Sequence, residues 1–288
     1  MAHTLSEYAA PRIDAHMHWW STRRSDYGWL TPELPTLYRD FGPAEATPLL
    51  EAARIGGVIL VQAAPTLAET LYLLDLARSN SYVLGVVGWA DLADPAEVDT
   101  LAAAELTVGV RPMLEDIADT NWILRPELRE GLQRIAAQDL AFEALITPRH
   151  LPIIAALVDR HPTLRVIVDH AAKPSITVGR SQPWKSQLAA LAAESRIYCK
   201  LSGLVTEAPR GAGFEALRPY VEAVFELFGA ERVIWGSDWP VLTQRMDYAS
   251  WVQLAEQLTA HLSPQSRAGV FGGNAQRFYG KRLRAAPG

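Results

Sequence analysis

The sequence lacks the features that mark secreted and membrane-spanning proteins. Its 288 residues include one cysteine, Cys199, so no intrachain disulfide can form, which is typical of a reducing compartment. The most apolar stretch, residues 56–64, is too short to cross a bilayer and contains Gln62. Residues 1–11 contain no apolar run of the signal-peptide type. We therefore predict a cytoplasmic protein without a membrane segment.

An excess of one charge is also lacking. The chain has 27 basic and 32 acidic residues, and both signs are spread along its length. The absence of a basic stripe argues against nucleic acid or an anionic membrane as a partner. The hydrophobic share of 49% and the charged share of 20% are ordinary for a globular protein. The length suits a single α/β barrel, whereas nothing in the sequence indicates the oligomeric state.

Apolar strand-like runs alternate with helical patterns along the chain. We predict strands at residues 12–16, 57–62, 83–89, 107–111, 141–146, 165–170, 197–201 and 232–237. Helical spacing covers residues 67–78, 127–138, 152–160, 185–194, 215–228 and 249–262, and Asp94-Pro95 and Ser263-Pro264 mark two further helix starts, the second opening the last helix. Eight such units predict a (β/α)8 TIM barrel, as one domain over residues 1–288 with its core at about 12–279. A doubly wound open sheet is the alternative, because periodicity does not show closure.

Residues 19–43 interrupt this alternation. The segment is longer than an ordinary loop between a strand and a helix, and it is rich in Trp, Tyr and Pro. Because the loops after the strands form the catalytic face of a barrel, we expect it to fold over the barrel mouth as a partial lid. The alternative is a surface excursion that packs on a neighbouring helix.

Two histidines one residue apart end the first predicted strand. Side chains alternate along a strand, so His16 and His18 point to one side, and Ala15 and Met17 to the other. Two neighbouring imidazoles can hold a divalent metal or a polar substrate. Because His-x-His is also common by chance, this pair needs support from other strand ends.

Most of the residues that end the eight predicted strands are polar or ionisable. In chain order the strand-end residues are His16 and His18, Gln62, Trp89, Arg111, Glu143, His170, Lys200 and Asp238. A packing core would not select them, because burial of an unpaired charge is costly. Structural alternatives remain: His170 as a core histidine, Asp238 as a helix cap, Arg111 paired with Glu115 or Asp116, and Glu143 on either face. Lys200 is expected inside the barrel and Cys199 against the helices, whereas His3, His161 and His261 fall outside the strand ends.

Seven of the nine tryptophans fall in or beside the predicted loops after strands. Such a rim suits stacking on sugar rings or other flat ligands. Alternatively, these indoles fill gaps beneath long loops.

Four motifs resemble the amidohydrolase superfamily: residues 14–19 (DAHMHW), 169–174 (DHAAKP), 199–207 (CKLSGLVTE) and 236–240 (GSDWP). More narrowly, they resemble its sugar-lactone hydrolase branch, the L-fuconolactonase- and L-rhamnonolactonase-like proteins, which are related to 2-pyrone-4,6-dicarboxylate lactonase. The likeness extends over about residues 12–279. It implies a (β/α)8 barrel that opens a lactone ring with water.

The resemblance also implies roles for individual residues. His16 and His18 match the first-strand pair of the family, His170 its sixth-strand histidine, Asp238 its eighth-strand aspartate, and Arg111 a substrate-facing arginine. Dinuclear members bring a bridging Lys or Glu from the fourth strand and a His from the fifth, where this chain has Arg111 and Glu143. Two options stay open. Either one divalent ion, zinc or manganese, is held by His16, His18 and Asp238 with Glu143 as a further ligand, or no metal is bound.

We predict an aldonolactone hydrolase in which Asp238 activates water. Asp238, His170 and Arg111 are assigned to catalysis, and the substrate contacts are expected from His16, His18, Gln62, Trp89, Glu143, Lys173, Trp19 and Trp239. Arg111 and Lys173 would favour a lactone that carries a carboxylate, whereas the Trp-rich rim favours a neutral one. The alternatives are a metal-dependent decarboxylase of the same superfamily and a non-catalytic sugar-binding barrel.

Overall fold

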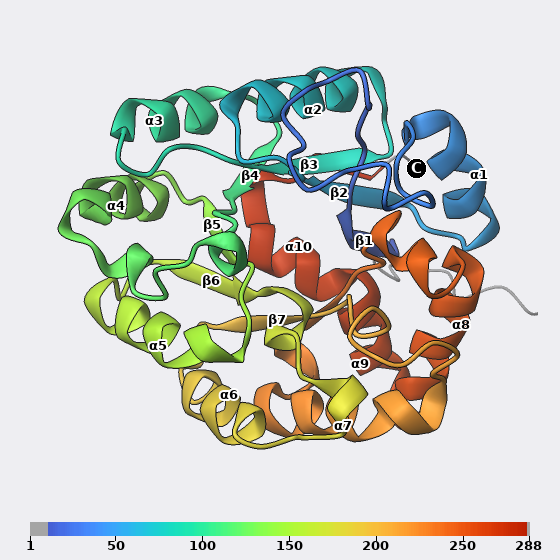
Figure 1. Ribbon diagram of the computed structural model, residues 1–288. Coiled ribbons are helices and arrows are strands. Elements are labelled where there is room, and N and C mark those ends of the chain that lie inside the picture. The colour runs from blue at the N-terminus through green and yellow to red at the C-terminus, as the bar shows by residue number, and fades with distance from the viewer. Residues whose placement is uncertain (1–10, 287–288) are drawn as a thin grey trace, which may run out of the picture.

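The computed structural model describes residues 11–286, which form a barrel of eight parallel strands surrounded by helices (Figure 1). The strands neighbour one another in chain order from β1 to β8. They are β1 (Ile13–Met17), β2 (Gly57–Val61), β3 (Val83–Gly88), β4 (Thr107–Val110), β5 (Ala141–Ala144), β6 (Arg165–Val168), β7 (Tyr198–Leu201) and β8 (Val233–Trp235). A parallel bridge between Met17 and Trp239 joins β1 to the segment after β8. The predicted TIM barrel is confirmed, and the open sheet is excluded.

The outer ring consists of helices that follow the strands. They are α1 (Pro43–Ala52), α2 (Leu67–Ser79), α3 (Pro95–Ala103), α4 (Arg129–Ala137), α5 (Leu151–Arg160), α6 (Trp184–Ala192), α7 (Phe214–Phe228) and α8 (Tyr248–Leu258). Two short helices, α9 (Pro264–Ala268) and α10 (Asn274–Tyr279), come after this ring. Side-chain caps explain several helix starts: the Thr66 hydroxyl accepts from the backbone N–H of Glu69, and the Asp247 carboxylate from that of Ser250. No helix in this part of the chain is long and apolar enough to cross a membrane.

Two helix predictions differ from the structure. Helix α1 was not predicted, because its residues are only weakly amphipathic and Pro48 lies within it. Ser263-Pro264 does begin a helix, but α9 is only five residues long and is not the last helix. A π-helical segment, Gly269–Gly273, and then α10 follow it.

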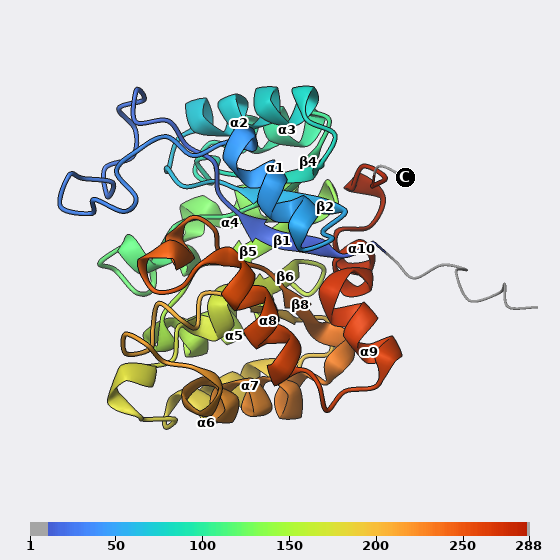
Figure 2. The ribbon, with the colours of Figure 1, turned by 90° about the vertical axis from the view of Figure 1, so that its right-hand side faces the viewer.

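Two apolar layers hold the barrel together. The outer layer lies between the strands and the ring of helices, and it includes Cys199 as predicted. The inner layer fills the barrel with side chains such as Ile59, Val87 and Ile167, and it includes Phe278 and Tyr279 of α10. Helix α10 closes the end of the barrel at which the strands begin, opposite the long loop after β1 (Figure 2). The inner layer therefore leaves only the other end, where the strands finish, open for a site.

The alternation predicted for β1 is broken. Met17 packs in the outer layer as expected, but Ala15 packs in the inner layer with Ile13. The pairing register between β1 and β2 shifts between Asp14 and Met17. Because of this irregularity, one more side chain of β1 points inward than strict alternation would allow. His16 and His18 still lie together, with ring centroids 4.9 Å apart.

The segment after β1 forms no helix before α1. Trp20 and Phe41 are joined by an isolated antiparallel bridge, which ties the two ends of this loop together. The indole of Trp29, between them, lines the cavity at the barrel mouth, whereas Arg24 of the same loop stacks on Tyr72 of α2, so the loop has features of both the predicted lid and its alternative. His3 and the N-terminal residues 1–10, on which the expectation of no signal peptide depends, lie outside the described residues.

Candidate active site

A cavity of about 200 Å³ lies at the carboxyl ends of the strands. Five predicted catalytic or substrate-binding residues with ionisable side chains line it: His18, Arg111, His170, Lys173 and Asp238. The remaining wall is formed by Trp29, Ala63, Met113, Glu115, Asp116, Leu145 and Val241. The structure therefore brings together side chains that are more than 200 residues apart in the sequence.

Asp238 is the centre of this group. Its Oδ1 lies 3.2 Å from Nε2 of His18, 3.8 Å from Nε2 of His16 and 4.0 Å from Nε2 of His170. Burial raises the pKa of Asp238, but the neighbouring imidazoles of His170 and His18 and the hydrogen bond with His18 act in the opposite direction, so its pKa lies below the usual value. Asp238 is therefore a carboxylate at neutral pH.

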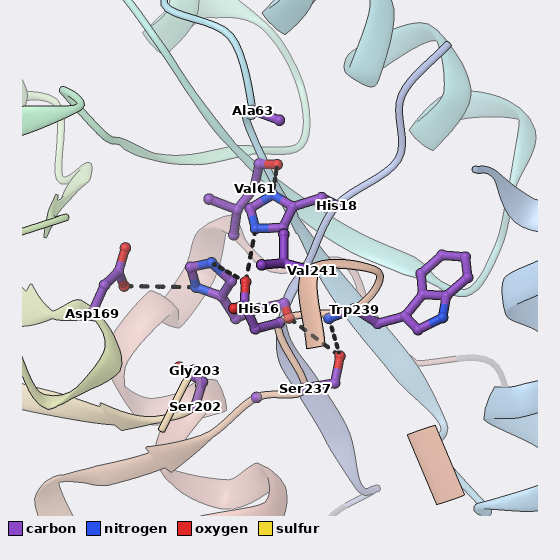
Figure 3. A network of polar contacts seen from close by, with 12 residues as sticks. His16, His18, Val61, Ala63, Asp169, Ser202, Gly203, Ser237, Trp239 and Val241 are labelled. Carbon is purple, nitrogen blue, oxygen red and sulfur yellow. Dashed lines mark hydrogen bonds and ion pairs between the residues drawn. The ribbon is translucent and has the colours of Figure 1, made fainter. Parts of the chain in front are cut away.

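The proton on His18 is fixed by the backbone. Nδ1 of His18 lies 2.8 Å from the carbonyl oxygen of Val61, which only accepts, so Nδ1 carries a proton (Figure 3). The neutral ring then presents a lone pair on Nε2 to the carboxylate of Asp238, 3.2 Å away. Two acceptors at this distance require a cation between them, which is either a second proton on His18 or a metal ion.

His16 is held in the opposite state. Its Nδ1 lies 3.0 Å from the ammonium group of Lys200, which only donates, so Nδ1 is the acceptor. Burial, and then the charge of Lys200, lower the pKa of His16 well below the usual value. The ring is therefore neutral and carries its proton on Nε2, which faces Asp238 and Arg111.

The predicted role of Glu143 at the cavity does not agree with its position. Its carboxylate accepts from Lys200 and from the hydroxyl of Tyr279, and its side chain is fully buried inside the barrel. Lys200 also lies 3.3 Å from Asp169. Glu143 lines no part of the cavity and belongs to neither group of residues that could hold a metal. It compensates the charge of Lys200, which was correctly expected inside the barrel.

His170 reaches the cavity through a left-handed turn. The backbone of four consecutive residues, from His170 to Lys173, has φ values between 49° and 59°. Nδ1 of His170 lies 2.8 Å from the hydroxyl oxygen of Ser202. Burial lowers the pKa of His170 to about 4, so the ring is neutral at neutral pH. Gly203 leaves just enough room, since a Cβ there would lie 2.5 Å from Nδ1 of His170.

Sequence reasoning missed the part played by Asp169. Its carboxylate lies 3.4 Å from Arg111 and 3.7 Å from Nδ1 of His16, and it is fully buried. Two-residue alternation placed Asp169 and His170 on opposite faces, but β6 ends at Val168 and the left-handed turn brings both inward. The sequence did contain a signal that Asp169 belongs to the site, because an acidic residue directly beside a strand-end histidine is rarely buried without a partner.

Arg111 and Lys173 are already paired. The Arg111 guanidinium donates to the backbone and side-chain oxygens of Gln62 and lies beside Asp169. Gln62 therefore orients Arg111 and does not itself line the cavity. The ammonium group of Lys173 lies 2.5 Å from the carboxylate of Glu115.

The predicted tryptophan contacts are mostly displaced from this cavity. Trp19 and Trp239 are buried, with 1% and 2% of their surfaces exposed, and they line no part of it. Trp239 packs edge-on against Phe41 beneath the long loop. This position agrees with the alternative that some indoles fill gaps beneath long loops. Trp89 lines an adjoining cavity, and Trp29, which was not assigned a role, lines both.

Together, the closed barrel and the histidine–aspartate cluster at its strand ends define a barrel enzyme that activates water or polarises a substrate. A family model described as Amidohydrolase matches residues 13–281, and the chain belongs to this amidohydrolase family. The predicted family is therefore confirmed.

Two curated relatives are similar over almost the whole chain. An L-fucono-1,5-lactonase of Burkholderia ambifaria is 47% identical over 277 residues, which cover 93% of this chain and 95% of the relative. An L-fucono-1,5-lactonase of Burkholderia multivorans is 34% identical, with 94% and 96% covered. A crystal structure of an amidohydrolase from Burkholderia multivorans with bound zinc has a TM-score of 0.89 at 34% identity, and covers 96% of this chain and all of that one.

The residues present fit one divalent ion. One ligand atom from each of His16, His18 and Asp238 lies within 4.8 Å of the others, and the unshared lone pair of His18 faces a carboxylate oxygen. His16 would bind an ion through Nε2 only by giving up the proton there, because Lys200 occupies its Nδ1. Zinc binds imidazole nitrogen and carboxylate oxygen in this way. Two cations oppose the ion, because Arg111 lies 3.4 Å from Nε2 of His16 and Lys200 lies at its Nδ1. The site is therefore suited to weak binding.

Proposed function

We propose that the chain hydrolyses the 1,5-lactone of a neutral sugar acid, with L-fucono-1,5-lactone as its first substrate. The observation that carries this proposal is the buried Asp238 carboxylate in a cavity at the barrel mouth, with three histidines around it, two of which line the cavity. The two curated lactonase relatives bear out the prediction of an enzyme that hydrolyses sugar-acid lactones. The substrate is therefore a small molecule. Location in the cytoplasm and the absence of a nucleic-acid partner stay predictions.

The state of the two cavity cations supports a neutral substrate. Lys173 is neutralised by Glu115, and Arg111 is held by Gln62 and Asp169. A lactone with a carboxylate would find no unpaired cation there and would lie near Glu115. Of the two substrate classes left open by the sequence, the uncharged aldonolactone therefore suits this cavity.

The reaction uses Asp238 twice. Its carboxylate takes a proton from water, and the hydroxide oxygen forms a bond to the lactone carbonyl carbon. The guanidinium of Arg111 donates to the carbonyl oxygen as it gains negative charge. His16 is fully buried and does not line the cavity, so it acts through its position beside Asp238 and Arg111. When the tetrahedral intermediate collapses, the bond from carbon to ring oxygen breaks. The protonated Asp238 returns its proton to that oxygen, so a hydroxy acid is released and the carboxylate is restored.

His170 contributes through position and polarity. Its neutral ring bounds the cavity 4.0 Å from Asp238 and is fixed by Ser202 on its other side. It therefore orients the water or substrate hydroxyl beside Asp238 without adding charge. A divalent ion on His16, His18 and Asp238 would supply Lewis acidity toward the carbonyl and the water.

Replacing Asp238 by asparagine tests the proposal. Asp238 has φ of +61°, a conformation that asparagine tolerates well, so the fold is expected to be retained. Loss of a positioned general base typically costs about 10²–10⁴-fold, so Asp238→Asn should reduce kcat for L-fucono-1,5-lactone to that extent. A pH-indicator assay measures acid release, and circular dichroism checks the fold.

Three results would count against the proposal. Near-normal turnover by Asp238→Asn would remove Asp238 from the mechanism. Release of carbon dioxide from an aromatic acid, with no acid release from any lactone, would favour the decarboxylase alternative. Saturable lactone binding without turnover would favour a sugar-binding barrel. Metal analysis of the purified protein, with activity before and after chelation, decides between the metal-bound and metal-free options.

A further inference from the structure

A second and larger cavity adjoins the catalytic one. Its volume is about 460 Å³, and it is lined by the indoles of Trp29, Trp89 and Trp122 with Pro65 and Met113. The catalytic cavity, at about 200 Å³, is below the range of about 300–1,000 Å³ that is usual for small-molecule sites, so it suits a single sugar ring. The proposed monosaccharide reaction leaves the second cavity without a role.

The two cavities lie side by side. Trp29, Met113 and Asp116 line both of them, so a group attached to a ligand beside Asp238 has to extend only past these three side chains to reach the second cavity.

The indoles come from three different loops, and hydrogen bonds hold the Trp29 indole and the Trp89 backbone in place. Trp29 donates from Nε1 to the carbonyl oxygen of Ala63 at 2.6 Å and packs edge-on against Trp20. The backbone N–H of Trp89 donates to the Thr70 hydroxyl, which in turn donates to the Trp89 carbonyl. All three cavity indoles are partly exposed, so they are not simply core residues. Preorganised aromatic faces of this kind bind the apolar faces of flat or ring-shaped groups.

The polar groups at the edge of this cavity indicate what kind of ring fits. Asp26 and Asp116 line it beside the indoles. The Asp26 carboxylate is held in place by Arg24 and the Thr66 hydroxyl, whereas Asp116 is exposed. Carboxylate oxygens accept hydrogen bonds from hydroxyl groups and repel anions. Indole faces combined with hydroxyl acceptors match a neutral sugar ring better than a purely apolar group or an acid.

We propose that the second cavity binds a sugar ring joined by a glycosidic bond to the lactone, so that the enzyme also opens lactones of disaccharide acids. This inference rests on the proposed lactonase function, because the lactone ring itself must lie beside Asp238. The chemistry is unchanged: water cleaves the lactone ester, and the glycosidic bond stays intact. The attached sugar contributes binding energy only.

The test compares L-fucono-1,5-lactone with derivatives that carry a galactosyl group at O2, O3 or O4. At least one derivative should have a kcat/KM about tenfold above that of the parent lactone, the gain expected from one or two sugar–indole contacts. Two variants reach only the second cavity. Trp122→Ala removes one indole, and Gly28→Phe fills the space, because a Cβ at Gly28 meets no atom within 4 Å.

Each variant should lower kcat/KM for the preferred derivative about 3- to 10-fold and leave the parent lactone within about twofold. Turnover of the parent with rejection of every galactosyl derivative, or derivatives unaffected by both variants, would overturn the inference. A phenyl ether of the lactone that surpasses every galactosyl derivative would also overturn it in favour of an aromatic occupant.

A binding measurement separates this inference from the proposed function. The galactosyl-fucose disaccharides corresponding to these derivatives are titrated against the protein, and intrinsic tryptophan fluorescence is followed. A saturable change that Trp122→Ala weakens supports the sugar subsite even if no lactone is turned over. Absence of any change in the wild-type protein, with normal turnover of L-fucono-1,5-lactone, refutes the subsite and leaves the lactonase function intact.

Discussion

Glu69 should make the stability of the protein fall as the pH rises. It lies in α2, and its fully buried carboxyl group accepts hydrogen bonds from the backbone N–H of Ala63, which lines the catalytic cavity. Burial raises the pKa of Glu69 from 4.5 to about 7, although hydrogen bonds from Ala63 and Ala64 act in the opposite direction. A difference of this size corresponds to about 3 kcal/mol between the protonated and ionised forms.

The sign follows from proton binding. Between pH 4.5 and 7 the unfolded chain has lost the Glu69 proton while the folded protein retains it. Because the folded state binds more protons in this window, the free energy of unfolding decreases as the pH rises. Below the window both states are protonated, and above it both are ionised and the loss is complete.

Glu69→Gln isolates this effect. Glutamine keeps a carbonyl oxygen for the Ala63 N–H but does not titrate, so the cost of the substitution itself is the same at every pH. Relative to the variant, the wild-type protein should lose about 3 kcal/mol of unfolding free energy between pH 4.5 and pH 8. Urea unfolding followed by tryptophan fluorescence measures both proteins, and all other titrating groups cancel in the difference.

Thr66→Ala is the matched control. It removes the hydroxyl that caps the same helix by accepting from the Glu69 N–H, and should cost about 1 kcal/mol at both pH values. If wild type and Glu69→Gln instead give parallel curves across the window, the folded environment does not favour the protonated carboxyl, and the reasoning from burial is refuted.

Two further substitutions test the cavity wall. Glu115→Gln releases Lys173 from its ion pair, so the ratio of kcat/KM for a glucarolactone, which carries a carboxylate, to that for a neutral lactone should rise about tenfold. An unchanged ratio would show that Lys173 is not available to the substrate. Gly203→Ala places a Cβ 2.5 Å from the ring of His170 at a φ of +65°, so His170 must move. We expect kcat/KM to fall about 10²-fold with the circular dichroism spectrum retained; full activity would remove His170 from the site.

The local pattern of the sequence was sufficient for the eight strands and for most of the helices. Apolar runs such as residues 57–62 and 165–170 are buried on both faces in a parallel sheet, and this demand leaves a continuous hydrophobic signal that does not depend on the rest of the chain. Periodicity left an open sheet as the alternative, and closure is seen only in the tertiary structure, where Met17 pairs with Trp239 after β8. The sequence pattern did not reveal helix α1, because this segment is weakly amphipathic and contains Pro48. Its burial depends on the neighbouring elements.

The sequence also determined which ionisable residues stand at strand ends, because their position after an apolar run is a local property. His18, Arg111, His170 and Asp238 were found in this way and line one cavity. Their states were decided only by the tertiary structure. The Val61 carbonyl, 43 positions from His18 in the sequence, fixes the proton on that ring. Lys200, 184 positions from His16, fixes the opposite tautomer there.

The tertiary structure alone also decided what each remaining side chain does. Glu143 is bound by Lys200 inside the barrel, and Lys173 is neutralised by Glu115. Two-residue alternation could not place Asp169, because the left-handed turn after β6 reorients the chain within a few residues. The type of a residue and its position at the end of a strand can be read from the neighbouring sequence. Charge compensation, tautomer and cavity shape depend instead on partners that only the closed barrel brings within a few ångströms.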